Sequence, residues 1–187
     1  MKKLIALVLS LLAVSSLVAG CSSGKGTTVN SGEKSVTFSL LSSPASLDPA
    51  TTTDGHSLMV ETQLFSMLVE SKGGTSNEIK PDIAESWEIS EDGLTYTFKL
   101  RDDVYFHNGK LLTADDVVYT FNRVMTEPYT SYYAAPIKSV EATDEHTFVA
   151  HLNYPFADFL TLVGGIYFGI CCEEAITAGS DFMYKPV

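Results

Sequence analysis

The 187-residue sequence has little positive charge. Its 12 Lys and Arg residues stand against 23 Asp and Glu residues, which gives a formal net charge of −11. Nucleic-acid binding requires clusters of Lys and Arg, and adsorption to anionic lipid requires basic patches. The composition therefore excludes a nucleic-acid partner and broad electrostatic attachment to a membrane.

The sequence also lacks the motifs that would identify an enzyme. There is no G-x-S-x-G motif, and no glycine-rich phosphate loop follows a predicted strand. The four histidines are scattered without metal-ligand spacing, at positions His56, His107, His146 and His151. We therefore expect that the protein is not an enzyme and that it has no catalytic residue, no metal site and no cofactor.

Cysteine is rare, with three in the chain, and two of the three are adjacent at Cys171 and Cys172. Neighbouring cysteines can pair only through a strained ring. A redox or metal site would need a spaced pair with further ligands, and none surround them. We predict that both are buried, reduced thiols without a function.

The N-terminus has the pattern of a secretory signal. Lys2 and Lys3 precede an apolar run over residues 4–18, and Leu17-Val18-Ala19-Gly20-Cys21 follows. The run is short for a spanning helix, which needs roughly 20 apolar residues. The site resembles the lipobox of bacterial lipoproteins, which implies lipidation of Cys21; the alternative is an ordinary secretory peptide with an incidental cysteine.

A predicted tether separates this signal from the folded part. Residues 22–34 are rich in Gly, Ser and Thr and have no apolar periodicity. The whole chain is 45% hydrophobic and 19% charged, a globular balance. We predict a signal peptide over residues 1–20, a flexible tether over 21–35 and a folded domain over 36–187.

Hydrophobic spacing predicts a mixed α/β domain. Residues 36–41 read as a strand, a loop with two prolines follows, and a helical face runs from Leu58 to Val69 towards Gly73. Thr95–Leu100 alternates with Tyr96, Phe98 and Leu100 on one face, and Thr113 begins a helix with a capping box. The other expected elements are a strand at 87–89, strands at 137–142 and 147–152, a helix at 156–163, a strand at 166–170 and a helix at 173–178.

The stretch Pro81–Val124, PDIAESWEISEDGLTYTFKLRDDVYFHNGKLLTADDVVYTFNRV, resembles a block of the peptide-type substrate-binding proteins of bacterial ABC importers, family 5. SPASLDP upstream and EATDEHTFVAHLNYPFADFL downstream extend the similarity. The resemblance implies a type II periplasmic-binding fold in which an extra small α/β domain spans about residues 60–165. It also implies that the chain is an N-terminal fragment holding the first lobe only. Within the block, Trp87, Arg101 and Asp116 are expected to be scaffold.

The resemblance further implies a function. The expected protein is a monomeric lipoprotein on the outer face of the cytoplasmic membrane or in the periplasm, which binds peptides or a related small solute and delivers them to ABC permease subunits. Its only attachment to the membrane would be the lipid anchor. The alternatives are a sensor or adhesin on the same scaffold, or a binder of nickel, haem or oligosaccharide.

Two places match positions where family members contact the ligand. Thr53, Asp54 and Gly55 follow the Leu-Asp-Pro loop, and Asp54 would meet a ligand ammonium group. The alternative to a ligand contact is that Asp54 belongs to a solvated acidic loop and caps the next helix. Tyr129 would line the peptide cleft with a flat ring and a hydroxyl. The alternative is that it packs with Tyr132 and Tyr133 on the small domain.

Overall fold

The computed structural model describes residues 37–71 and 78–179. The predicted signal peptide, Cys21 and the predicted tether lie outside the described residues. The chain divides into one unit over Met1–Ser39 and another over Leu40–Val187, and every helix and strand below belongs to the second unit. Within the described ranges, no helix is both long and apolar enough to span a bilayer.

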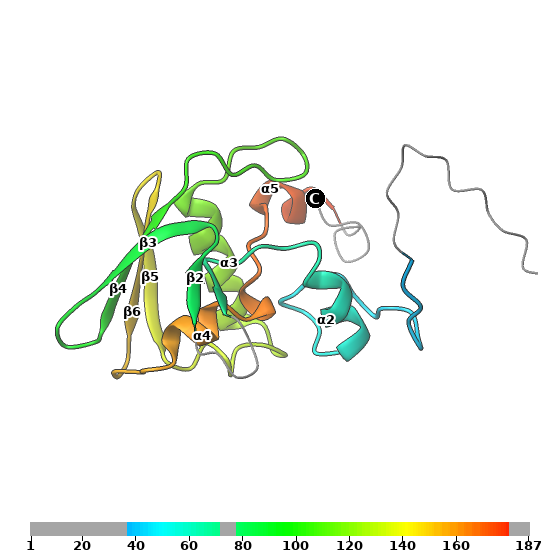
Figure 1. The fold of residues 1–187 in the computed structure, drawn as a ribbon, viewed down its shortest axis with the longest axis horizontal. Coiled ribbons are helices and arrows are strands. Elements are labelled where there is room, and N and C mark those ends of the chain that lie inside the picture. The colour runs from blue at the N-terminus through cyan, green and yellow to red at the C-terminus, as the bar shows by residue number, and fades with distance from the viewer. Residues whose placement is uncertain (1–36, 72–77, 180–187) are drawn as a thin grey trace, which may run out of the picture. The chain divides into compact units, whose positions relative to one another are not determined.

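The second unit contains both helices and strands (Figure 1). In chain order they are α2 (Gly55–Glu61), β1 (Val69–Ser71), β2 (Ile79–Pro81), β3 (Ala84–Ile89), β4 (Thr95–Leu100), α3 (Ala114–Thr126), β5 (Ile137–Asp144), β6 (Thr147–Leu152), α4 (Phe159–Val163), the 3₁₀ helix η1 (Ile166–Phe168) and α5 (Glu173–Thr177).

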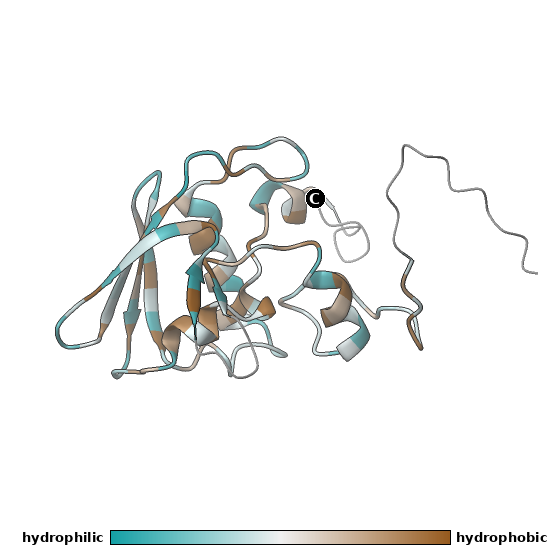
Figure 2. Cartoon of the chain, in the orientation of Figure 1, coloured by the Kyte–Doolittle hydropathy of each residue, from teal (hydrophilic) through white to brown (hydrophobic). Residues whose placement is uncertain are grey.

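The larger sheet of this unit is four-stranded and antiparallel, in the order β3-β4-β6-β5. Tyr96, Phe98 and Leu100 of β4 are buried on one face, as the alternation predicted. Phe98 pairs in register with Phe148 of β6, and their ring centroids are 6.0 Å apart. Along the strands, hydrophilic and hydrophobic residues alternate (Figure 2).

Helix α3 covers the apolar face of the sheet (Figure 1). Its start is capped as predicted, because the Asp116 carboxylate accepts hydrogen bonds from the Thr113 backbone N–H and hydroxyl, both at 3.1 Å. Val117, Phe121 and Val124 are fully buried. The Phe121 ring lies 4.7 Å from that of Phe148, between centroids. The predicted buried stripe is therefore the side of the helix that closes the core.

The expected long helix from Leu58 to Val69 is wrong in its second half. Helix α2 ends at Glu61, Leu68 lies in a bend, Val69 begins β1, and both residues are fully buried. Val69 pairs with Pro81 in the small sheet of β1 and β2, and the backbone N–H of Ala84 donates to the carbonyl of Leu68. Pairing with a distant segment therefore overrides helical spacing, which short apolar runs do not distinguish from strand.

The strand expected over residues 36–41 is also wrong in its described part. Residues 37–41 form no strand, and Phe38 and Leu41 are 81% and 98% exposed. A strand needs a hydrogen-bonding neighbour, and none of the described strands pairs with this segment.

The strand expected over residues 166–170 is replaced by the 3₁₀ helix η1. The N–H groups of Phe168 and Gly169 donate to the carbonyls of Gly165 and Ile166 three residues back. A Cβ at Gly169 would lie 2.9 Å from the Cβ of Phe65, so this close approach requires glycine. Phe168 and Ile170 of this short apolar run are buried, but the backbone forms a tight helical turn instead of a strand.

The remaining predictions agree with the structure except at element ends. The expected strands at 137–142 and 147–152 are β5 and β6, and the expected helix at 173–178 is α5. Strand β3 begins three residues earlier than predicted, and α4 begins three residues later. Both cysteines are free and buried, as predicted. Burial raises the pKa of the Cys171 thiol, so it stays protonated and unreactive.

Candidate ligand-binding site

The loop before α2 is held in shape by its own polar groups. The hydroxyl of Ser57 accepts hydrogen bonds from the backbone N–H groups of Ala45 and Ser46, at 2.9 and 3.2 Å. The Ser46 hydroxyl accepts from the N–H of Asp48 at 3.0 Å. Ser46, Asp48 and Ser57 are all buried. The loop therefore presents the residues that follow it from a fixed base.

A long-range ion pair fastens this loop to helix α3. The two Nη atoms of Arg123 donate to the two carboxylate oxygens of Asp48, at 3.1 and 2.7 Å. Their side chains are 14% and 5% exposed. A paired fork of this kind fixes orientation as well as distance. Sequence reasoning missed the pair, because no local pattern links residues 75 positions apart.

A second connection brings Tyr129 to the same loop. The hydroxyl of Thr130, fully buried, donates to the carbonyl of Ala50 at 3.0 Å. Its neighbour Tyr129 is 61% exposed. The two places predicted from the resemblance therefore belong to adjoining segments: one lies just after Ala50 and the other just before Thr130.

Asp54 has the capping role that the sequence offered as an alternative. Its Oδ2 accepts hydrogen bonds from the N–H and the hydroxyl of Ser57, at 2.9 and 3.0 Å. These bonds, the backbone one first, lower the pKa of Asp54. Its Oδ1 lies 3.8 Å from Nδ1 of His56, and the side chain is 37% exposed. Capping thus occupies one carboxylate oxygen, the other lies near His56, and an ammonium contact stays a prediction.

Thr53 and Gly55 flank this cap, and both are exposed. A Cβ placed on Gly55 would meet no atom within 4 Å, so the backbone there has open space on its side-chain face. Extended backbone of a ligand can approach such a position closely. Contact of Thr53, Gly55 or Tyr129 with a ligand stays a prediction.

Glu61, at the end of α2, is the functional candidate that sequence reasoning missed. Its side chain is fully buried, and among the described residues neither carboxyl oxygen has a hydrogen-bond partner. Burial, together with the charges of Asp48 and Asp54, raises the pKa of Glu61 to about 7. Burying a carboxyl without a hydrogen-bond partner is costly. The end of α2 therefore carries an acid whose hydrogen-bonding capacity is not met among the described residues.

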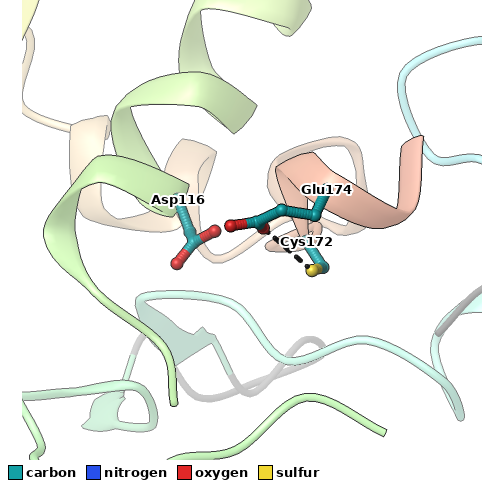
Figure 3. Close-up of side chains that lie close together, drawn as sticks. All are labelled: Asp116, Cys172 and Glu174. Atoms are coloured by element: carbon teal, nitrogen blue, oxygen red, sulfur yellow. Dashed lines mark hydrogen bonds between the residues drawn. The ribbon is translucent and has the colours of Figure 1, made fainter. Parts of the chain in front are cut away.

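A cluster of possible metal ligands lies elsewhere, at the start of α3 and α5. Asp116, Cys172 and Glu174 bring one ligand atom each to within 4.8 Å of one another (Figure 3). The ammonium of Lys110 donates to Asp116 at 2.7 Å and also to Glu174. The cluster therefore already holds a cation of the chain itself, and its chemistry is that of an ion-pair network joining α5 to α3.

One histidine has partners that resemble those of a catalytic base. His151 lies between the Thr95 hydroxyl, 3.3 Å from Nδ1, and the Glu141 carboxylate, 3.0 Å from Nε2. These three residues are cross-strand neighbours of β4, β6 and β5, and the His151 and Glu141 side chains are 36% and 57% exposed. A solvated sheet surface does not exclude water as a catalytic site must. The arrangement is a cross-strand pairing.

A small cavity of about 170 Å³ lies apart from these groups. The chain segments Leu64–Ser66 and Val104–His107 form its walls, with Ile83, Leu112 and Ile170. It contains none of the four residues predicted to meet a ligand.

The family of bacterial extracellular solute-binding proteins, family 5, matches the chain over residues 78–187 through its middle region. Heme-binding protein A of Haemophilus influenzae is 39% identical over 152 residues, which covers 70% of this chain and 28% of that protein. Di/tripeptide-binding protein 1 of Pseudomonas aeruginosa is 35% identical over 140 residues, covering 63% of this chain and 26% of that protein.

Solved structures of periplasmic binding proteins also resemble this chain. The ABC transporter-associated periplasmic binding protein DppA from Helicobacter pylori, in complex with peptide STSA, superposes with a TM-score of 0.67 at 34% identity, over 76% of this chain and 33% of that one. HbpA2 from Haemophilus parasuis superposes with a TM-score of 0.63 at 34% identity, over 73% and 31%. The chain thus spans about a quarter to a third of the length of these proteins.

The structural likeness shows that the mixed α/β fold is that of part of a periplasmic binding protein, as expected. The match over residues 78–187 includes the sheet, α3 and the Tyr129 segment described above. This chain belongs to the bacterial extracellular solute-binding proteins of family 5.

Proposed function

We propose that the chain is part of the extracytoplasmic receptor of an ABC importer, and that this receptor captures short peptides. The observation that carries the proposal is the family match over residues 78–187, in the company of relatives that bind di- and tripeptides. Solute-binding proteins bind and release their cargo without changing it, so we assign no catalytic residue. The permease subunits of the importer would be the receptor's protein partners, and the receptor would be a monomer.

The geometry supports peptide capture at the surface formed by Thr53, Asp54, Gly55 and Tyr129, which we call the loop site. Asp54 has a partly exposed carboxylate with one oxygen that does not cap the helix, and open space adjoins the backbone of Gly55, which suits the ammonium and amide groups of a peptide N-terminus. The base of the loop site is rigid, because the Asp48 and Arg123 pair and the Thr130 bond hold it. Rigid presentation limits the entropy lost when a ligand binds.

A second candidate ligand is haem. It is favoured by the 39% identity to Heme-binding protein A, which is higher than the identity to the peptide-binding relative quoted above. The two ligands would bind the loop site differently, because a peptide has an N-terminal ammonium group that can contact Asp54 and haem has none.

Calorimetric titration of the protein at its full natural length tests the proposal. We expect binding of mixed di- and tripeptides, and a weaker response when the peptide N-terminus is acetylated, because acetylation removes the ammonium charge. Binding of haem with no response to peptides would move the assignment to the second candidate. No response to either, or to nickel or oligosaccharide, would contradict a receptor role and leave a sensor or adhesin.

We also propose the domain division and anchor that the sequence indicates. Residues 1–20 would be a signal peptide, residues 21–35 a tether, and residues from about 60 to 165 a small domain within the first lobe. Acyl chains on Cys21 would hold the protein outside the cell, since each buried methylene contributes about 0.8 kcal/mol and several chains bind a bilayer stably. Replacement Cys21→Ala should move the protein from the membrane fraction to the soluble fraction. A variant that stayed in the membrane fraction would contradict the lipid anchor.

A further inference from the structure

Three tyrosine rings pack against one another in a row. The ring centroids of Tyr132 and Tyr133 are 4.0 Å apart with planes tilted by 35°, and those of Tyr133 and Tyr167 are 4.1 Å apart with planes 19° from parallel. We call Tyr132, Tyr133 and Tyr167 the tyrosine ladder. The sequence indicated that Tyr132 and Tyr133 were neighbours, but the third member comes from η1, more than thirty positions later.

The fold holds the middle ring and the inner ring of the tyrosine ladder in place. On one side, the N–H groups of Tyr133 and Ala134 donate to the carbonyls of Thr130 and Ser131, which makes a tight series of turns. On the other side, Phe168 follows Tyr167 and is buried, with its ring centroid 4.9 Å from that of Phe121. A stack built on turns and on the core keeps its spacing, so it is preorganised for a further ring.

The outer end of the ladder faces solvent. Tyr132 is 60% exposed although one side of its ring stacks on Tyr133. From Pro128 to Ile137 the sequence has no charged residue, and the tyrosine hydroxyls are neutral at physiological pH. A neutral, flat surface with polar tips favours a neutral, planar group over a charged or branched one.

The ladder adjoins the loop site through the Thr130 segment. Thr130 lies between Tyr129 and Tyr132, and its hydroxyl is bonded to the carbonyl of Ala50, four residues before Asp54. The segment that carries Tyr132 and Tyr133 is therefore joined by a hydrogen bond to the segment that leads to Asp54.

We propose that Tyr132 is a stacking subsite for a planar conjugated group of the ligand, such as an aromatic side chain of a bound peptide or a porphyrin ring. The inference rests on the proposed receptor function and narrows its ligand class. The bound ring continues the series of rings at the spacing that the three tyrosines already have.

A pair of tripeptides of matched size tests the subsite at the full natural length of the protein. One is Ala-Phe-Ala, and the other carries cyclohexylalanine, which is saturated and not planar, in place of phenylalanine. We expect calorimetry to show about 2- to 13-fold tighter binding of the aromatic peptide, the range that measured aromatic pair energies imply. The replacement Tyr132→Leu should abolish this preference, and Tyr132→Phe should keep it.

Tyr105→Leu is the matched control, because Tyr105 is 64% exposed and lies on another loop. It should leave the aromatic preference unchanged. Haem is titrated in parallel: binding of haem that Tyr132→Leu weakens, without peptide binding, identifies the porphyrin as the source of the planar group.

The possible failures are distinguishable. Equal binding of the two peptides, or a preference that Tyr132→Leu does not reduce, would overturn the subsite and leave the receptor function intact. An absence of binding by the peptides and by haem would overturn both. Thermal unfolding of Tyr132→Leu alongside Tyr132→Phe separates loss of the subsite from loss of the fold.

Discussion

The sheet with its covering helix α3 is held together by apolar side chains, whereas the segment from Ser42 to Glu61 buries mainly polar ones. In the first region Phe98, Phe121 and Phe148 are fully buried and in contact. The second buries its polar groups at Ser46, Asp48, Thr52, Ser57 and Glu61. The two regions therefore depend on different interactions: the apolar core acts as a scaffold, and the polar segment carries Thr53, Asp54 and Gly55, three of the residues predicted to contact a ligand.

The largest effect is expected from removing the ring at the centre of the apolar region. Phe121→Ala deletes a side chain that contacts both Phe148 and Phe168. Truncation of a buried Phe costs about 3–5 kcal/mol, from lost transfer free energy and the cavity left behind. Urea unfolding followed by circular dichroism measures it. Asn122→Ala, at an exposed position on the same helix, should change little, and equal losses would contradict the central role of the ring.

The second-largest loss of stability is expected from breaking the Asp48–Arg123 ion pair, which joins the two regions. Arg123→Met leaves the Asp48 carboxylate buried without its partner, and breaking such a pair costs about 3 kcal/mol or more. Arg101→Met is the matched control, because the Arg101 and Asp103 pair is exposed and should contribute less than about 1 kcal/mol. The same unfolding measurement compares the two variants. If they lost equal stability, the junction would not depend on this pair.

A third experiment uses pH to examine the polar region alone. The folded pKa of Glu61 is about 7, above the ordinary value of 4.5. The folded state therefore binds this proton more tightly than the unfolded state does. Its contribution to stability is fully present below pH 4.5 and is lost as the pH rises through 7.

Replacement Glu61→Gln removes this dependence. Relative to the variant, the natural chain should lose about 2 to 3 kcal/mol of unfolding free energy between pH 5 and pH 8, which follows from the two pKa values. Denaturant unfolding at both pH values measures the difference. Glu88→Gln, at an exposed position of β3, is the control and should follow the natural chain. Parallel curves for all three proteins would show that Glu61 is satisfied in solution.

The contrast between the two regions also explains what the sequence can predict. Strand β4 and helix α3 were predicted with their buried faces, because period-two and helical patterns record burial against a single core. Leu68 and Val69 were misassigned, because their strand depends on pairing with residues 79–84. Asp54 was named as a possible cap from local spacing alone. The contacts of Arg123 with Asp48 and of Tyr167 with Tyr133 were not predicted, because the partners lie far apart in the sequence.

The smallest effect separates the two roles of Asp54. Asp54→Ala removes the N-cap of α2 and should cost about 1 kcal/mol of stability. Asp54→Asn keeps a capping oxygen but removes the negative charge, so its stability should remain close to that of the natural chain. Because an ammonium group prefers a charged acceptor, Asp54→Asn should nevertheless weaken binding of a peptide with a free N-terminus and spare an acetylated one. Calorimetry with both peptides decides the matter: equal affinities of the Asn variant and the natural protein would leave Asp54 as a cap only, and the polar region would then serve stability in the way that the apolar one does.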